Sequence, residues 1–591
     1  MPKNCCESSS KSNADSTTFI TRTSTTNNMT MKRIITLAAI FVQCLIGMAQ
    51  EAPTQGWAKK ALKSIISVNT YDQEQNLLHS GTGFYVTGNG IAVADYDLFR
   101  NAYSAVIIDQ AGNKSNVVRI LGANDTYGLV KFSTDVNKTT PLTLSKEKLA
   151  EGSKLMILPY SKSKPATCPA ANVKSIETVN DSIPYYTLDY PIDAKYVGCP
   201  VFNTEGEVVA TLQQPLTNKG YAIGIDFAKN LSIGAISTKV DNYALNNINI
   251  KKGLPETKEE SLVYLYFKSN TADNDEYIDL LNLFIDTYPD NAEGYLRRAT
   301  PLIDTYKFEE ADKDLQHYYE LAADKADANA KIAEIIQAKL TYQPDSAYAK
   351  WNYDVAVDYV NKAIEASPKY EYRALKAKIL MAKQDFDGAY DIYDQMNKSE
   401  ERSPATLYAA SIASENRGDS TAVQIELLDS AIAMMPTPMP AEAATYIMRH
   451  ALLLTRVGRY RDAVADYNKY SYLSNSSVNH KFYFDRALLE INSKMYQQAL
   501  DDLTTATSQA PGEPLYLLEL AALQLRVGMN KECIESAKKA MQLNPQSYDA
   551  YRILGYAQLV VGDKVNGKAN LQRAIDMGDE AAKELLNNYN K

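Results

Sequence analysis

Histidine is scarce in this chain of 591 residues, which contains only His79, His317, His450 and His480. The six cysteines are equally sparse, and no His and Cys residues cluster at the spacing of metal ligands. No glycine-rich loop has the pattern that cradles a phosphate. The sequence therefore gives no support for a metal centre or a cofactor, and we expect neither.

An excess of positive charge is also lacking, because 62 Lys and Arg residues are outnumbered by 71 Asp and Glu residues, a net charge of −9. Proteins that bind nucleic acid carry a basic face, so this balance argues against a nucleic-acid partner. The composition, 45% hydrophobic and 23% charged, is that of a globular protein. A chain of this length has room for roughly three or four domains of ~150 residues.

Long hydrophobic runs are missing as well. The apolar run Ile34–Gly47 is shorter than the ~20 residues of a membrane-spanning helix, and no later segment is long enough. It follows Met31-Lys32-Arg33 and precedes Met48-Ala49-Gln50, an order typical of a secretory signal peptide. We therefore predict that residues 1–49 are a leader plus signal peptide, with its apolar region at 34–47, and that the mature chain is exported without a membrane span.

Export changes the expected chemistry of the remaining cysteines. Beyond residue 49 the chain keeps Cys168, Cys199 and Cys533. An oxidising compartment permits a disulfide between Cys168 and Cys199, and the sequence leaves open whether the two pair. Cys533 falls at a small-residue position of the repeats described below, which favours a buried, unreactive thiol.

Residues 58–240 have the pattern of an all-β domain. Two short apolar segments, 84–86 and 91–93, flank the turn signal Gly88-Asn89-Gly90. Further strands are expected at 105–108, 117–121, 129–132, 154–158, 173–178, 185–188, 208–212 and 221–225. Short strands at regular spacing indicate a closed or sandwiched β domain. A polar stretch at 246–260, with Gly253 and Pro255, is expected to be the linker to the second half of the chain.

The second half is a repeat array. An aromatic residue, two mostly polar residues and Ala recur at 308–311, 386–389, 460–463 and 496–499. Small residues return every ~34 residues, from Ala463 through Ala499 and Cys533 to Gly567, which is typical of tetratricopeptide repeats (TPRs). We predict eight or nine units over residues 261–579 and a capping helix at 580–591. Units are expected to begin near Ala292, Tyr370, Ala405, Ala444, His480, Pro514 and Tyr548, with an irregular one between the first two and a degenerate one over 258–291.

The array resembles TPR proteins, whose first helices line a concave groove. In the frame above, the groove positions of the C-terminal units are mostly apolar, and the basic clamp that binds a carboxylate is absent. This pattern predicts an amphipathic helix or apolar peptide as the bound partner. The alternative is that the same side chains pack against the chain itself. The candidate partner-binding residues are Met448, Leu452, Leu515, Leu518, Leu525, Arg552 and Tyr556.

The β domain carries four motifs in the order found in trypsin-like serine proteases, and it resembles the HtrA branch in particular. Residues 81–84 are similar to the Gly-x-Gly-Phe strand of the first barrel, and 90–97 to the segment that carries the catalytic His. Residues 125–132 are similar to the segment of the catalytic Asp, and 197–210 to the segment of the catalytic Ser. The resemblance implies a double β-barrel fold.

The catalytic positions do not match that family. They hold Asp97 in place of His, Gly128 in place of Asp and Val197 in place of Ser. The mechanism needs a hydroxyl nucleophile, an imidazole base and a carboxylate that orients the base. His79 is the one histidine of the β domain, and we expect it to precede the first barrel strand. The resemblance therefore implies a pseudoprotease with no catalytic residues.

The sequence as a whole predicts an all-β trypsin-like double barrel followed by an all-α TPR solenoid. The favoured function is an exported, non-catalytic scaffold for protein–protein interaction, in the periplasm or cell envelope of a bacterium or secreted. The alternative is an active trypsin-like peptidase, or another hydrolase that uses Asp95 and Asp97 as paired carboxylates. A third hypothesis is a scaffold for assembly of the cell envelope.

Overall fold

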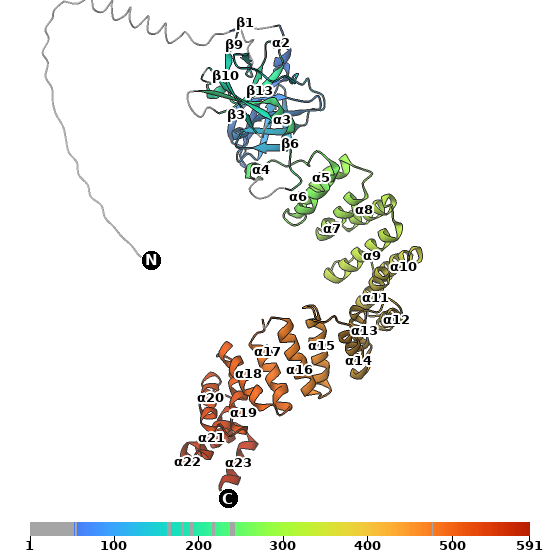
Figure 1. Cartoon of the computed structure of the whole chain (residues 1–591), viewed down its shortest axis with the longest axis vertical. Coiled ribbons are helices and arrows are strands. Elements are labelled where there is room, and N and C mark those ends of the chain that lie inside the picture. Colours follow the sequence, from blue (N-terminus) through green and yellow to red (C-terminus); the bar gives the residue numbers. More distant parts are fainter. Residues whose placement is uncertain are drawn as a thin grey trace, which may run out of the picture. The chain divides into compact units, whose positions relative to one another are not determined.

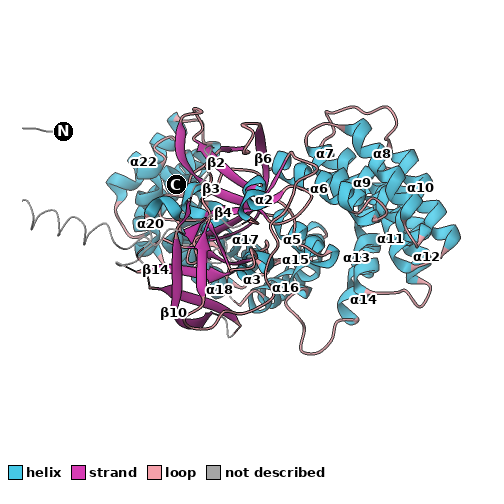
Figure 2. Ribbon diagram, turned by 90° about the horizontal axis from the view of Figure 1, so that it is seen from above, coloured by secondary structure: helices cyan, strands magenta, loops and turns pink. Residues whose placement is uncertain are grey.

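The computed structural model describes residues 52–53, 56–161, 167–179, 182–189, 191, 193–214, 219–236, 243–475 and 477–590 (Figure 1). The predicted leader and signal peptide, residues 1–49, lie outside the described residues. The chain divides into two compact units with a boundary between Pro289 and Asp290. All the strands belong to the first unit, and the second is entirely helical (Figure 2).

The first unit begins with a closed barrel of six antiparallel strands in the order β2-β3-β4-β7-β6-β5. Gly83, in the motif at 81–84, lies between two neighbouring strands that leave no room for a side chain. A methyl group there would be 2.9 Å from the Val68 side chain and the Val93 carbonyl. The strands are β2 Ile65–Tyr71, β3 Leu77–Tyr85, β4 Ile91–Asp95, β5 Ser104–Ile108, β6 Lys114–Asn124 and β7 Leu129–Thr134.

A second closed barrel follows, in the order β10-β11-β14-β13-β12-β8. A short pair, β1 Ala52–Pro53 with β9 Thr167–Cys168, lies beside it. The prediction of a double β barrel is therefore confirmed. Its strands are β8 Lys154–Ile157, β10 Ala170–Val179, β11 Ile183–Leu188, β12 Pro200–Phe202, β13 Val208–Leu212 and β14 Gly220–Gly224.

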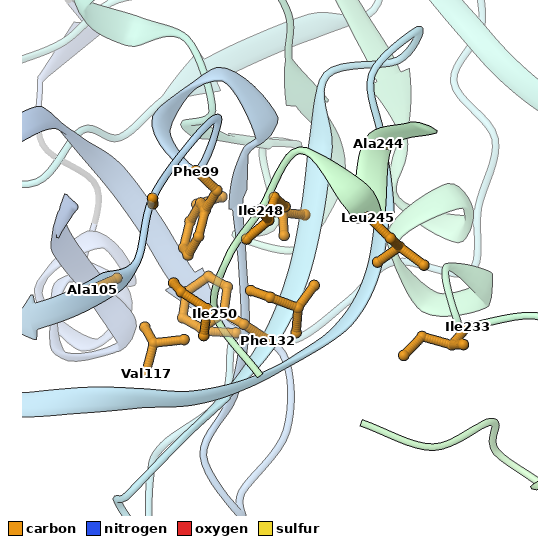
Figure 3. Packing of buried hydrophobic residues seen from close by; sticks show 14 of the residues in the cluster. Phe99, Ala105, Val117, Phe132, Ile233, Ala244, Leu245, Ile248 and Ile250 are labelled. Atoms are coloured by element: carbon orange, nitrogen blue, oxygen red, sulfur yellow. The ribbon is translucent and has the colours of Figure 1, made fainter. Parts of the chain in front are cut away.

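The stretch expected to be a linker, residues 246–260, is instead part of the first unit. Ile248 and Ile250 are buried in the core of the first barrel, beside Phe99 and Phe132 (Figure 3). The backbone is also tied to strand β6, because the Ile120 amide donates to the Lys251 carbonyl at 2.8 Å. The stretch is polar with isolated isoleucines, which is typical of a linker. Its burial depends on the first barrel, whose strands lie far away in the sequence, so the local pattern did not reveal it.

Two helices after this stretch also belong to the first unit. Side chains of α5 (Lys258–Lys268) and α6 (Asn274–Thr287) enter the same hydrophobic core as the first barrel. Leu265 and Phe284 are fully buried there. The helix pair at the place of the predicted degenerate repeat, over 258–291, is thus present but packs with the barrel, and the array that we predicted from residue 261 has its first helices in the first unit. The second unit begins with α7 at Ala292.

The second unit is a row of helix pairs in the predicted register, the architecture of a TPR solenoid. The predicted small residues at the helix crossings are at most 2% exposed, for example Ala299, Ala463 and Cys533. The helices are α7 Ala292–Asp304, α8 Phe308–Leu321, α9 Lys325–Tyr342, α10 Tyr353–Ala366, α11 Tyr370–Lys383, α12 Phe386–Asn397, α13 Pro404–Arg417, α14 Thr421–Ala433, α15 Ala443–Arg456, α16 Tyr460–Leu473, α17 His480–Asn492, α18 Tyr496–Gln509, α19 Pro514–Arg526, α20 Asn530–Leu543, α21 Tyr548–Val560, α22 Lys564–Asp576 and α23 Glu580–Asn590.

The turn between the two helices of a repeat needs a left-handed residue. Seven units place a residue of positive φ at the same point of that turn, in four cases glycine, which adopts this conformation at no steric cost. The residues are Tyr306, Gln384, Gly418, Gly458, Lys494, Gly528 and Gly562. The last unit adds a second steric requirement, because a methyl group on Gly555 of α21 would lie 2.9 Å from the Gly567 carbonyl of α22.

The irregular unit is held together by an aromatic and acidic cluster. Its first helix, α9, is longer than the others, and the following loop folds back onto α8. Tyr348 donates to Glu309 at 2.8 Å, and the Trp351 indole donates to Asp312 at 3.0 Å. This insertion lies within the second compact unit of the chain.

Candidate functional site

The predicted groove residues lie on the first helices of three units. Leu452 of α15 and Leu515 of α19 are each 49% exposed. Met448, Leu518 and Leu525 are partly buried against the helix pairs beneath them. These side chains therefore expose apolar surface while their bases are fixed by packing, as a binding face requires.

Arg552, another predicted partner-binding residue, forms ion pairs within the array. Its guanidinium pairs with Asp579, at 2.7 Å, and also with Asp549 on its own helix. Asp579 is buried, and its carboxylate also accepts the Ala581 amide at the start of α23. Arg552 thus joins α21 to the turn before the last helix, and its charge is already neutralised. Tyr556, one turn further along α21, remains partly exposed.

A set of hydrogen-bonded pairs was not predicted. Three units join their two helices through a basic side chain and an aspartate 16 positions apart: Arg298–Asp314, His450–Asp466 and Arg486–Asp502, at 2.6–2.8 Å. His450 is buried in the array. The signal was present in the sequence as a basic residue and an aspartate that recur at the same two positions of the repeat frame.

In the first unit, the three segments that resemble the catalytic segments of proteases converge on Asp95. This residue ends β4, and its Oδ1 accepts the Asp97 amide at 2.9 Å, which caps the short 3-10 helix η2 (Tyr96–Leu98). A methyl group on Gly128 would lie 3.2 Å from Asp95 Oδ2. A methyl group on Gly198 would lie 3.0 Å from the Asp95 amide nitrogen. Asp95 therefore occupies the space where the three segments meet.

The two neighbouring acids are in opposite environments. Asp95 is 5% exposed, and its burial, together with the charge of Asp97, raises its pKa to about 7. Asp97 is half exposed and forms an ion pair with Arg100 at 2.7 Å. The carboxyl group of Asp95 is therefore about half protonated near neutral pH, while Asp97 remains on the surface.

Two side chains close to this convergence carry a thiol or a hydroxyl group. Cys199 is fully buried, and burial raises the pKa of its thiol to about 12, so it carries almost no thiolate at neutral pH. The Thr82 hydroxyl accepts the Tyr160 amide at 3.3 Å. The one histidine of this unit, His79, is exposed on strand β3. It lies within the barrel rather than before it, contrary to our expectation.

Comparison with protein families bears on the first unit. Residues 81–210 match the family model of the trypsin-like peptidase domain. The double barrel of the first unit thus contains a trypsin-like segment, and it is called the trypsin-like domain below. The matched segment begins at the Gly81 motif and ends in β13, so it contains the convergence at Asp95.

The curated relatives carry TPR or DnaJ names. The chain is 22% identical over 310 residues to the DnaJ protein P58IPK homolog B of Oryza sativa subsp. japonica, and 23% identical over 302 residues to the P58IPK homolog of Arabidopsis thaliana. These alignments cover 52% and 50% of this chain and 60% and 57% of the relatives. Tetratricopeptide repeat protein 13 of Homo sapiens is 26% identical over 181 residues, 31% of this chain and 21% of that protein. The chain thus spans less than two thirds of each relative.

The cysteines of the trypsin-like domain are free thiols. Cys168 and Cys199 are both buried, and each lies in a different hydrophobic cluster. The disulfide considered from the sequence is therefore not formed. Cys533 in the array is free and fully buried, at a helix crossing.

Neither a metal site nor a membrane span emerges from the described residues. Within them, no three His, Cys, Asp or Glu side chains are grouped so as to hold a metal ion. None of the described helices is both long enough and apolar enough to span a bilayer.

Proposed function

We propose that this protein is an exported, non-catalytic interaction scaffold. Its TPR array binds a protein or peptide partner through the exposed apolar face of α15, α19 and α21. The trypsin-like domain serves as a second binding or spacer module. The observation that carries this proposal is the exposure of Leu452 and Leu515, which both lie at predicted groove positions of first helices.

The non-catalytic part of the proposal is supported by the residues at Asp95. The segments that would supply a base, an orienting carboxylate and a nucleophile bring Asp97, Gly128 and Val197 instead. A valine side chain has no atom that can attack a carbonyl, and Asp95 fills the space between the segments. Loss of all three groups leaves none of the proton transfers that acyl transfer needs.

The location of the protein is supported by the N-terminal sequence pattern. A basic residue pair, an apolar run and a small-residue cleavage site precede Gln50. We propose export to the periplasm or envelope of a bacterium. Cell fractionation with N-terminal sequencing of the mature protein tests this: export predicts a chain that begins close to Gln50, and an uncleaved chain in the cytosol contradicts it.

The binding part is tested by charge substitution on the apolar face. The double variant Leu452→Asp and Leu515→Asp in the full mature chain is expected to lose partners that the wild-type protein captures after crosslinking. Val565→Asp is the matched control, because Val565 of α22 is 81% exposed outside the predicted groove positions. Equal capture by all three proteins would contradict binding through this face.

The non-catalytic part has its own test. Purified mature protein is incubated with a fluorophosphonate probe, and the labelled sites are mapped by mass spectrometry. The proposal predicts no labelling in the trypsin-like domain. Labelling of one serine that disappears when that serine is replaced by alanine would establish an active hydrolase and overturn the proposal.

A further inference from the structure

One face of α19 combines apolar side chains with a single acid. Leu515, Leu518, Glu519, Ala522 and Leu525 follow the spacing that places residues on one side of a helix. Leu515 is exposed, and Leu518, Ala522 and Leu525 are partly buried against α20 and α21. These side chains give α19 an apolar face along most of its length.

Glu519 lies in the middle of this face without a partner. It is half-buried, and among the described residues it makes neither a hydrogen bond nor an ion pair. Burial, followed by the nearby charge of Asp549 on α21, raises its pKa, and only the more distant Arg526 opposes this. A partly desolvated charge with no partner is costly, so the site favours a group that neutralises it.

The cations of the adjacent first helices cannot supply that group. Arg552 of α21 is held by Asp549 and Asp579. Lys481 of α17 is held by Asp485 at 2.6 Å. The charge of Arg526 acts on Glu519, but no cation among the described residues forms an ion pair with it, which leaves that position open to a molecule outside the chain.

We propose that the α19 face binds a peptide segment that carries apolar side chains and one lysine or arginine, whose cation pairs with Glu519. This proposal rests on the function proposed above and specifies the chemistry of the partner. The leucines remove apolar surface of the peptide from water, and Glu519 selects the charge between those apolar residues. An acidic residue at the same point meets both Glu519 and Asp549 and is rejected.

The experiment uses three fluorescein-labelled helical peptides with identical leucines. They differ only in one central residue, which is lysine, glutamine or glutamate. Fluorescence anisotropy with the full mature protein gives the affinity of each peptide. The lysine peptide is expected to bind about tenfold more tightly than the glutamine peptide, the effect of ~1.4 kcal/mol, and the glutamate peptide more weakly than both.

Two variants make the test specific. Glu519→Gln is expected to bind all three peptides with nearly equal affinity. Glu535→Gln is the control, because Glu535 is an exposed acid of α20, and this variant keeps the wild-type preference. Circular dichroism checks that both variants are folded.

The outcomes separate this inference from the proposed function. Equal binding of the three peptides to the wild-type protein, or a lysine preference that survives Glu519→Gln, overturns the role of Glu519 and leaves the binding face intact. If no peptide binds, and the Leu452→Asp and Leu515→Asp variant still captures every partner of the wild-type protein, then both the role of Glu519 and the proposed binding face are overturned.

Discussion

Replacement of Asp95 by Asn tests the account of the buried carboxyl group. Burial and the charge of Asp97 raise the pKa of Asp95 from an ordinary value near 3.8 to about 7. Asn has almost the same shape, cannot ionise, and can still accept the Asp97 amide that caps η2. The variant therefore removes the cost of the buried charge and keeps the local hydrogen bond.

Proton linkage gives the direction and the size of the expected change in stability with pH. Between the two pKa values the folded state holds a proton that the unfolded state has released, so stability falls as the pH rises from about 4 to about 7. A rise of about three pKa units at ~1.4 kcal/mol each gives an upper limit of about 4 kcal/mol. Asp95→Asn is thus expected to change stability little at pH 4 and to stabilise the trypsin-like domain above pH 7.

The two tryptophans provide the assay. Trp57 stacks on Phe202 in the trypsin-like domain, and Trp351 lies in the array. In a Trp351→Phe background, tryptophan fluorescence in urea reports only the unfolding of the trypsin-like domain. Glu205→Gln, an exposed acid in the β12–β13 hairpin, is the control and should not change the pH dependence. If Asp95→Asn leaves the slope of stability against pH unchanged between pH 4 and 8, the reasoning is refuted.

Three further predictions concern the array and the domain boundary. Gly555→Ala should destabilise the last repeat by about 1–3 kcal/mol, because the steric clash of the new methyl group with the backbone of α22 outweighs the better helix propensity of Ala. Thermal unfolding measures this change, and a stabilised variant would contradict the close packing. A fragment ending at Pro289 should fold, with dispersed amide resonances, whereas one ending at Asn246 should aggregate because it lacks the core residues of α5 and α6; a soluble, folded shorter fragment would refute the revised boundary. The three cysteines of the mature chain should react with a thiol reagent only after denaturation, all three without prior reduction; two that need a reductant would indicate the disulfide.

The helical array was readable from sequence because its rules are local. Small residues at crossings such as Ala463 and Ala499 recur at a fixed period, and each contacts only a neighbouring helix. The strands of the double barrel were readable for a similar reason, through short apolar runs between turn residues. In both cases one element and its neighbour in the chain determine the pattern.

The failures involve contacts between distant parts of the chain. Ile248 and Ile250 look like isolated apolar residues in a polar stretch until the first barrel provides a surface for them. The ion pair of Arg552 was not predicted, because its partner, Asp579, lies in the turn before the last helix, beyond the repeat frame. Glu519 was missed for the opposite reason. Its importance comes from the absence of any partner, which a sequence does not reveal.

The most direct test of the central claim is photo-crosslinking from the apolar face in living cells. A photoreactive amino acid replaces Leu515 in the full-length protein, and a second protein carries it at Val565 as a control. The account predicts a discrete crosslinked partner from position 515, which crosslinks through a segment with apolar residues and a lysine or arginine, and none from position 565. The same crosslinks from both positions, or none from position 515, would contradict it.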